Sequence, residues 1–144
     1  MRIMVATDGS DSANRAVEFA ARLACDLNCG LKIVNVVGAY DRPPEQLLAF
    51  ARCEHVTPQA FLSDLSEQAL RMAKQRAIEL GVSDIQLESQ KGEASRWIVE
   101  IARRDRDDVI VLGKRGLGRV SGLLLGSVSQ EVVSIASCAV IVVP

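Results

Sequence analysis

The sequence predicts a doubly wound α/β fold, in which a five-stranded parallel sheet carries helices on both faces. Three observations favour this fold. Five short runs, either continuously apolar or alternating between apolar and polar residues, are separated by four amphipathic segments. This is the pattern of consecutive β-α-β units. Crossovers between parallel strands are right-handed, so the connecting helices fold back onto the sheet. Neither a linker nor a low-complexity segment interrupts residues 1–144, which we therefore expect to form one domain.

The predicted strands are short runs that end at glycine or at another turn signal. Val109–Leu112 ends abruptly at Gly113, as a buried parallel strand does. Ile85–Glu88 alternates between apolar and polar residues, which indicates a half-exposed strand at a sheet edge. The five predicted strands are Ile3–Ala6, Leu31–Val37, Ile85–Glu88, Val109–Leu112 and Ala139–Val143.

The two longer predicted helices have recognisable start and stop signals. The first begins at a cap among residues 10–12 and extends to about Asn28, and we expect Gly30 to end it in the left-handed conformation. The second begins after Thr57, with proline at its first helical position, and Gly81 stops it. Six residues are expected on the apolar side of this second helix: Leu62, Leu65, Ala69, Met72, Ala73 and Leu80.

Two further helices are shorter, and one region has no clear pattern. A short helix carries Ile98, and the last helix spans residues 128–136. Residues 39–56 lack periodicity: the two prolines of 41–44 exclude a helix there, whereas Glu45–Phe50 suits a turn or two. The inner face of the last helix is expected to be Val132, Val133 and Ala136.

Composition excludes several functional classes. Apolar residues make up 49% and charged residues 24% of the chain, as in a soluble globular protein. Seventeen cations nearly balance eighteen anions, so a basic nucleic-acid surface is not expected. No apolar run approaches membrane-spanning length and no export signal is visible, so we expect a cytoplasmic protein whose four cysteines are thiols. The cysteines lack zinc-site spacing.

The stretch that follows Val109–Leu112 carries the strongest functional signal. It holds five glycines and three cations, Lys114, Arg115 and Arg119, and closes on Gly126-Ser127 before the last helix. Glycines allow backbone N–H groups to approach a ligand closely. The start of a helix adds unpaired N–H donors and a partial positive charge. A strand, a glycine loop and a helix start together predict a phosphate cradle.

Alternative interpretations of these residues remain open. Neither the P-loop signature nor the dinucleotide fingerprint fits the glycine spacing, and the glycines could simply form turns. Asp8 could serve only to cap the first helix, and Ser127 only to cap the last. The loop cations could be solvated. His55, the sole histidine, has no nucleophile nearby in the sequence, so no catalytic residue is predicted.

The spacing Gly113-x2-Gly116-x9-Gly126-Ser127 resembles the nucleotide-binding motif of the universal stress protein family. The resemblance covers nearly the whole chain. Two positions depart from the family pattern, because Asn35 stands where histidine is frequent and Ala139 where proline is common. Further segments that resemble the family are Thr7-Asp8-Gly9-Ser10, Asn35-Val36-Val37, Gly92-Glu93, Asp107 to Gly113 and Cys138 to Val143.

The resemblance implies the strand order 3-2-1-4-5 and a site for ATP with magnesium or manganese. Asp8 would lie near the ribose or, indirectly, near a phosphate-bound metal, and Val36 would contact adenine. Ser127 and Ser129 would bond the phosphates that the loop glycines admit. The full set of expected nucleotide-binding residues is Thr7, Asp8, Val36, Gly113, Lys114, Arg115, Gly116, Gly126, Ser127, Val128 and Ser129.

The leading functional hypothesis is a cytoplasmic, ATP-binding stress-response protein that acts as a nucleotide-responsive regulator of an unknown protein partner. The resemblance also implies a homodimer in which two copies of Ala139–Val143 pair about a two-fold axis, because a bare apolar edge strand invites pairing. Two alternatives compete: a dimeric interaction module that binds no nucleotide, and a slow ATPase. Catalysis is the weakest, because Asp8 is the one candidate base near the phosphates.

Overall fold

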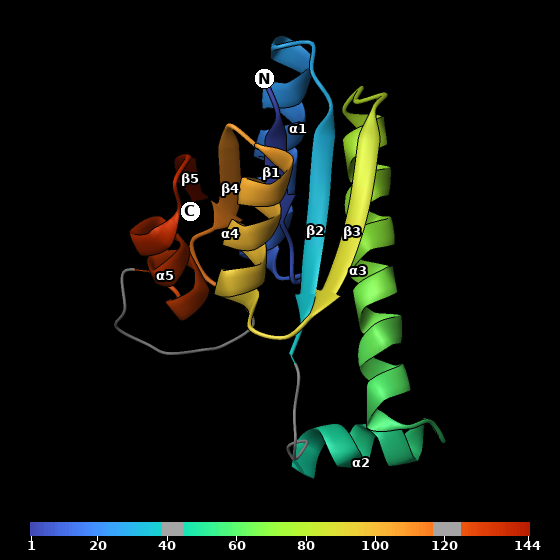
Figure 1. The fold of residues 1–144 in the computed structure, drawn as a ribbon. Helices are drawn as coiled ribbons and strands as arrows, with labels where there is room; N and C mark the ends of the chain where they lie inside the picture. The colour runs from blue at the N-terminus through green and yellow to red at the C-terminus, as the bar shows by residue number, and fades with distance from the viewer. Residues whose placement is uncertain (39–44, 117–124) are drawn as a thin grey trace.

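The computed structural model describes residues 1–38, 45–116 and 125–144. Its strands form one parallel sheet in the order β3-β2-β1-β4-β5 (Figure 1), which confirms the predicted fold class and strand order. The predictions for residues 41–44 and for Arg119 lie outside the described residues. The strands are β1 (Ile3–Ala6), β2 (Leu31–Val37), β3 (Ile85–Lys91), β4 (Val109–Gly113) and β5 (Ala139–Val143).

The register of the sheet places its topological switch point between β1 and β4. Ile3 of β1 lies beside Leu31 of β2 on one side and beside Val109 of β4 on the other. The chain runs outward from β1 through β2 to β3, then returns to the far side of β1 as β4. The connections that leave β1 and β4 therefore diverge at the carboxyl edge of the sheet, where open α/β sheets bind their ligands.

Helices cover both faces of the sheet because successive strand residues point to opposite sides. Ile3 and Val5 pack against α1 and α3, whereas Met4 packs against α4 and α5. The helices that flank the sheet are seen in Figure 1. None of the described helices is both long and apolar enough to cross a membrane. The helices are α1 (Asp11–Asp26), α2 (Glu45–Cys53), α3 (Pro58–Glu79), α4 (Ala94–Asp105) and α5 (Ser127–Ile135).

The start of α1 follows the sequence prediction, but its end does not. Ser10 is the N-cap, and its hydroxyl accepts a hydrogen bond from the Ala13 N–H at 3.2 Å. The left-handed residue after α1 is Asn28, with φ of 49°, so the assignment of this role to Gly30 is wrong. Asparagine tolerates that conformation. Gly30 serves close packing instead, because a Cβ there would lie 2.5 Å from the Asp84 carboxylate.

The apolar face predicted for α3 is partly wrong. Leu65 and Met72 are 46% and 60% exposed, and the side chains that face the core are Ser66, Leu70, Ala73 and Ala77. A prediction from periodicity favours large apolar residues, whereas the close packing of α3 on α1 and the sheet mostly uses small side chains. The same error affects α5, where Val132 is buried but Val133 is 48% exposed.

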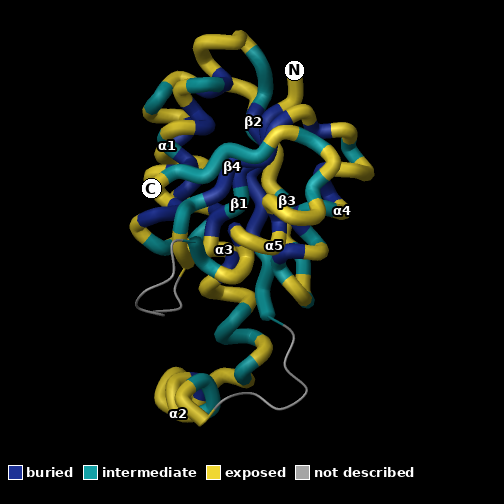
Figure 2. The backbone as a smooth tube through the Cα atoms, turned by 90° about the vertical axis from the view of Figure 1, so that its left-hand side faces the viewer, coloured by how far each residue is buried: buried dark blue, intermediate teal, exposed yellow. Residues whose placement is uncertain are grey.

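Helix α2 projects from the carboxyl side of the sheet, and most of its residues are exposed (Figure 2). It extends the helical turns expected for Glu45–Phe50 as far as Cys53. It is joined to the start of α3 by parallel stacking of the Phe50 and Phe61 rings, whose centroids are 6.3 Å apart. Thr57 caps α3 and Gly81, with φ of 98°, follows its end, as predicted.

Candidate functional site

A cavity of about 370 Å³ opens at the carboxyl ends of β1 and β4. This volume lies within the range of roughly 300–1,000 Å³ that is usual for small-molecule sites. Ten of the eleven residues predicted to bind nucleotide line it, and Lys114 does not. The ten are Thr7, Asp8, Val36, Gly113, Arg115, Gly116, Gly126, Ser127, Val128 and Ser129.

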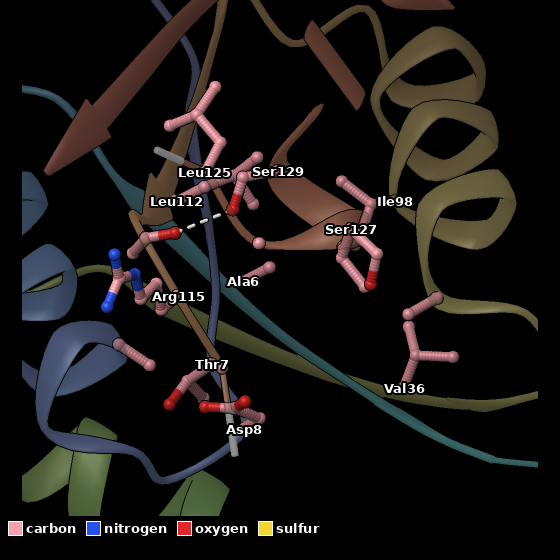
Figure 3. A pocket seen from close by; sticks show the side chains of 16 residues that line it. Ala6, Thr7, Asp8, Val36, Ile98, Leu112, Arg115, Leu125, Ser127 and Ser129 are labelled. Carbon is pink, nitrogen blue, oxygen red and sulfur yellow. Dashed lines mark hydrogen bonds between the residues drawn. The ribbon is translucent and has the colours of Figure 1, made fainter. Parts of the chain in front are cut away.

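One side of the cavity is apolar. Val36 of β2 and Ile98 of α4 lie on the opposite side of the cavity from Arg115 (Figure 3). This arrangement separates a surface suited to an aromatic base from a surface suited to charged groups. The sequence analysis missed six lining residues, Ala6, Ala13, Ala94, Ile98, Leu112 and Leu125. Strand alternation could have identified Ala6 and Leu112, which lie in β1 and β4 on the same face as Met4 and Ile110.

The turn between β1 and α1 presents the carboxylate of Asp8. Its Oδ1 accepts a hydrogen bond from the Ser10 N–H at 2.9 Å, and the Thr7 hydroxyl accepts one from the Gly9 N–H at 3.2 Å. Asp8 therefore shapes the turn, but Ser10 is the helix cap. The other carboxylate oxygen of Asp8 lies 2.5 Å from where a Cβ on Gly116 would be. The acidic turn and the glycine loop thus meet directly.

The strand side of the glycine loop is held by α1 and β5. A Cβ on Gly113 would lie 2.7 to 2.8 Å from backbone atoms of Ser12 and Ala13, so glycine is needed for β4 to reach the first turn of α1. The Lys114 N–H donates to the Val143 carbonyl at 2.6 Å, and the Arg115 N–H donates to the Ser12 hydroxyl at 3.3 Å. These contacts fix the start of the loop.

The other side of the loop folds back onto the first. The Gly126 N–H donates to the Lys114 carbonyl at 2.8 Å, and the Ser129 hydroxyl donates to the Gly113 carbonyl at 2.8 Å (Figure 3). A Cβ on Gly126 would lie 3.3 Å from the Cα of Arg115. Because the described glycines of the motif have no left-handed φ, close approach rather than backbone conformation explains them.

Helix α5 begins at the cavity. Gly126 is its N-cap and Ser127 its first helical residue, so the interpretation of Ser127 as the cap is wrong. Because the first N–H groups of an α-helix have no carbonyl partner within it, Ser127 and Val128 bring N–H donors and a partial positive charge to the cavity wall. Arg115 adds a full positive charge to the same cavity.

These groups fit a nucleotide with its phosphates and a divalent ion. Helix N–H groups and an arginine bind phosphate oxygens well. Magnesium takes one or two protein carboxylates together with substrate phosphates, and Asp8 offers such a carboxylate. Among the described residues, no group of three His, Cys, Asp or Glu side chains could hold a metal ion.

Two universal stress proteins have sequences similar to this chain over most of their own length. A universal stress protein of Thermus aquaticus is 33% identical over 145 residues, which cover 98% of this chain and 96% of that protein. One of Methanocaldococcus jannaschii is 32% identical over 142 residues, which cover 99% of this chain and 81% of that protein.

Solved structures agree with the architecture. UspA of Lactobacillus plantarum has a TM-score of 0.82 at 24% identity, with 100% of this chain and 97% of that chain covered. A universal stress protein in complex with cAMP has a TM-score of 0.71 at 30% identity, with the same coverage. One of Archaeoglobus fulgidus in complex with dAMP has a TM-score of 0.70 at 22% identity, with 100% and 98% covered. The profile of the universal stress protein family matches residues 1–144, and the chain belongs to that family.

Proposed function

We propose that this protein binds ATP, with magnesium or manganese, in the cavity between the Asp8 turn and the glycine loop, and acts as a cytoplasmic, nucleotide-responsive regulator in a stress response. One observation carries the proposal: a carboxylate, a glycine loop, an arginine and a helix start border the same cavity. The complexes of similar proteins with cAMP and dAMP support an adenine nucleotide. We also propose that residues 1–144 form a single domain and that the regulator acts on a protein partner whose identity is unknown.

Each part of the site has a distinct role in the proposal. Adenine packs between Val36 and Ile98, and the phosphates reach the loop, Arg115 and the first turn of α5. The Ser127 side chain bonds a phosphate oxygen, whereas Ser129 acts by holding Gly113, because its one hydroxyl hydrogen is already donated there. Lys114 supports the site through its backbone carbonyl, which accepts a hydrogen bond from the Gly126 N–H and so closes the loop.

The proposed homodimer uses the outer edge of β5. Within the described sheet, β5 pairs only with β4, and its residues 140–143 are half-buried valine and isoleucine. The other edge strand, β3, is protected from pairing with another chain because polar residues such as Glu88 are interspersed along it. Helix α5, which packs beside β5, leaves Ile135 47% exposed. These features favour β5 as the edge that pairs with a second copy.

The direction of the β5 backbone gives a test of that dimer. The Ala139 N–H donates to the Asp108 carbonyl, so the N–H groups of Val140 and Val142 point away from β4. Val142→Pro removes one outward donor and is expected to yield a monomer in size-exclusion chromatography with light scattering. Ile141→Pro removes an inward donor and is expected to destabilise the fold instead. A parent protein that is monomeric at micromolar concentration contradicts the dimer.

Nucleotide binding is tested by purifying the protein without added nucleotide, denaturing it and separating the supernatant by anion exchange. We expect adenine nucleotide to be released. Trp97, the sole tryptophan, gives a second signal because it lies in α4 between Ala94 and Ile98 and donates its Nε1–H to the Lys91 carbonyl at 3.0 Å. ATP added to stripped protein is expected to change its fluorescence. No released nucleotide and no fluorescence change would favour the interaction module.

A further inference from the structure

Asn35 is a buried polar side chain whose contact lies just behind the proposed site. It belongs to β2, where it is 7% exposed among apolar neighbours. Its Nδ2 group donates a hydrogen bond of 2.7 Å to the backbone carbonyl of Thr7. Burying an amide is unfavourable unless it is hydrogen-bonded, so this contact is the reason that an asparagine is tolerated here.

The Asn35 bond fixes the residue at which the chain leaves β1. The Thr7 N–H already donates to the Val34 carbonyl at 2.8 Å, so both backbone polar groups of Thr7 are bound to β2. Thr7 is itself buried, at 4% exposure. The peptide plane that follows Thr7 therefore has little freedom to rotate.

This anchoring sets the direction in which Asp8 faces. The Thr7–Asp8 peptide bond is trans, so the Asp8 N–H points opposite to the Thr7 carbonyl. The carbonyl points toward β2, and β1 lies between β2 and β4, so the Asp8 N–H points toward β4 and the glycine loop. The approach of its carboxylate to the Gly116 position agrees with that direction.

We infer that Asn35 is a positioning residue for the nucleotide site: its amide holds the Thr7 carbonyl and thereby directs the Asp8 turn at the ligand. The inference rests on the proposed function. The chemical requirement is a neutral donor that reaches a backbone carbonyl. A histidine N–H meets this requirement, whereas a leucine side chain of similar size does not.

The test compares ATP affinities by calorimetry on nucleotide-stripped protein. Asn35→Leu is expected to weaken binding about tenfold, the effect of roughly one lost hydrogen bond, and Asn35→His to stay within about threefold of the parent. Because Asn35 acts through the Asp8 turn, adding Asn35→Leu to Asp8→Ala should weaken ATP binding by less than about twofold relative to Asp8→Ala alone. Ser66→Ala is the control: it removes a partly buried hydrogen bond of 2.8 Å to Ser89, neither residue lines the cavity, and affinity should be unchanged.

A second readout does not depend on ligand. The Ser10 amide donates to the Asp8 carboxylate, so its hydrogen exchange in the free protein should speed up about tenfold in Asn35→Leu and stay unchanged in Ser66→Ala. Parent-like affinity or parent-like Ser10 exchange in Asn35→Leu overturns the inference and leaves the proposed function standing. A parent protein that binds no adenine nucleotide overturns both.

Discussion

The same substitution at two glycines of the motif is expected to have opposite consequences. A Cβ on Gly113 would meet backbone atoms of Ser12 and Ala13 at 2.7 to 2.8 Å, and backbone cannot move aside without shifting the first turn of α1. A Cβ on Gly116 would meet the Asp8 carboxylate oxygen at 2.5 Å, but that oxygen is the end of a side chain that can rotate. Gly113→Ala therefore tests the fold, and Gly116→Ala tests the site.

The magnitudes follow from these contacts. Overpacking of a rigid neighbour costs about 1–3 kcal/mol, and a chain of this length loses roughly 2–4 °C in melting temperature per kcal/mol, so Gly113→Ala should lower it by about 2–12 °C. Gly116→Ala should melt within about 2 °C of the parent, because rotation of Asp8 relieves the contact. A displaced Asp8 loses a charge-assisted contact of roughly 1.5–3 kcal/mol, which weakens ATP binding about 10- to 150-fold.

Circular dichroism melting and calorimetric ATP titration measure the two effects on the same preparations. Comparison of the two alanine variants controls for the loss of a glycine as such. The reasoning is refuted if Gly116→Ala lowers the melting temperature as much as Gly113→Ala does. It is refuted equally if Gly116→Ala binds ATP as tightly as the parent.

Three further predictions concern the loop and the opposite end of the sheet. Gly126→Val should abolish ATP binding, because it places a branched side chain on the cavity wall where the phosphates must pass. The fold should be retained, because the 3.3 Å approach of the added Cβ to Arg115 Cα needs a shift of only a few tenths of an ångström. Parent-like calorimetric binding would contradict this. Lys32→Met should destabilise the protein by about 3–5 kcal/mol in urea unfolding, because it leaves the buried Asp107 carboxylate without its partner at 3.1 Å, yet ATP affinity should not change. Hydrogen bonds from Arg104 and, to a smaller extent, from Lys32 hold the pKa of Asp105 well below its usual value of about 4. The ionised Asp105 therefore stabilises the folded state fully above about pH 4, and this stabilisation is lost as the pH falls below that value. Asp105→Asn should reduce the fall in unfolding free energy between about pH 4 and pH 2, and an unchanged slope would contradict the assignment.

The fold could be predicted because it depends on patterns that the sequence carries locally. Short β-branched runs that end at glycine, such as Val109–Leu112, identify buried strands, and capped amphipathic segments identify helices. The order of the strands came from the resemblance, because the alternation of strands and helices is compatible with several orders. Ile85–Glu88 was predicted as an edge strand from its alternation, and β3 is an edge strand in the sheet.

The details that were missed depend on contacts between distant segments. Gly113 lines the cavity, but the sequence does not reveal that a Cβ there would also meet backbone atoms of Ser12 and Ala13. Lys32 lies in a strand that is predicted from its apolar residues, and its ion-pair partner Asp107 follows α4. The two residues are distant in the sequence, so the pair is visible only in the folded structure. The exposed faces of Met72 and Val133 show the same limit, because periodicity locates an apolar stripe but not the side on which helices pack most closely.

The central claim is that the cavity binds adenine nucleotide, and one calorimetric titration tests it most directly. ATP with magnesium is titrated into nucleotide-stripped protein, and the same titration is repeated with Gly116→Ala. We expect saturable binding at one site per chain in the parent and an affinity about 10- to 150-fold weaker in the variant. The absence of binding heat in the parent, both with and without magnesium, would contradict it.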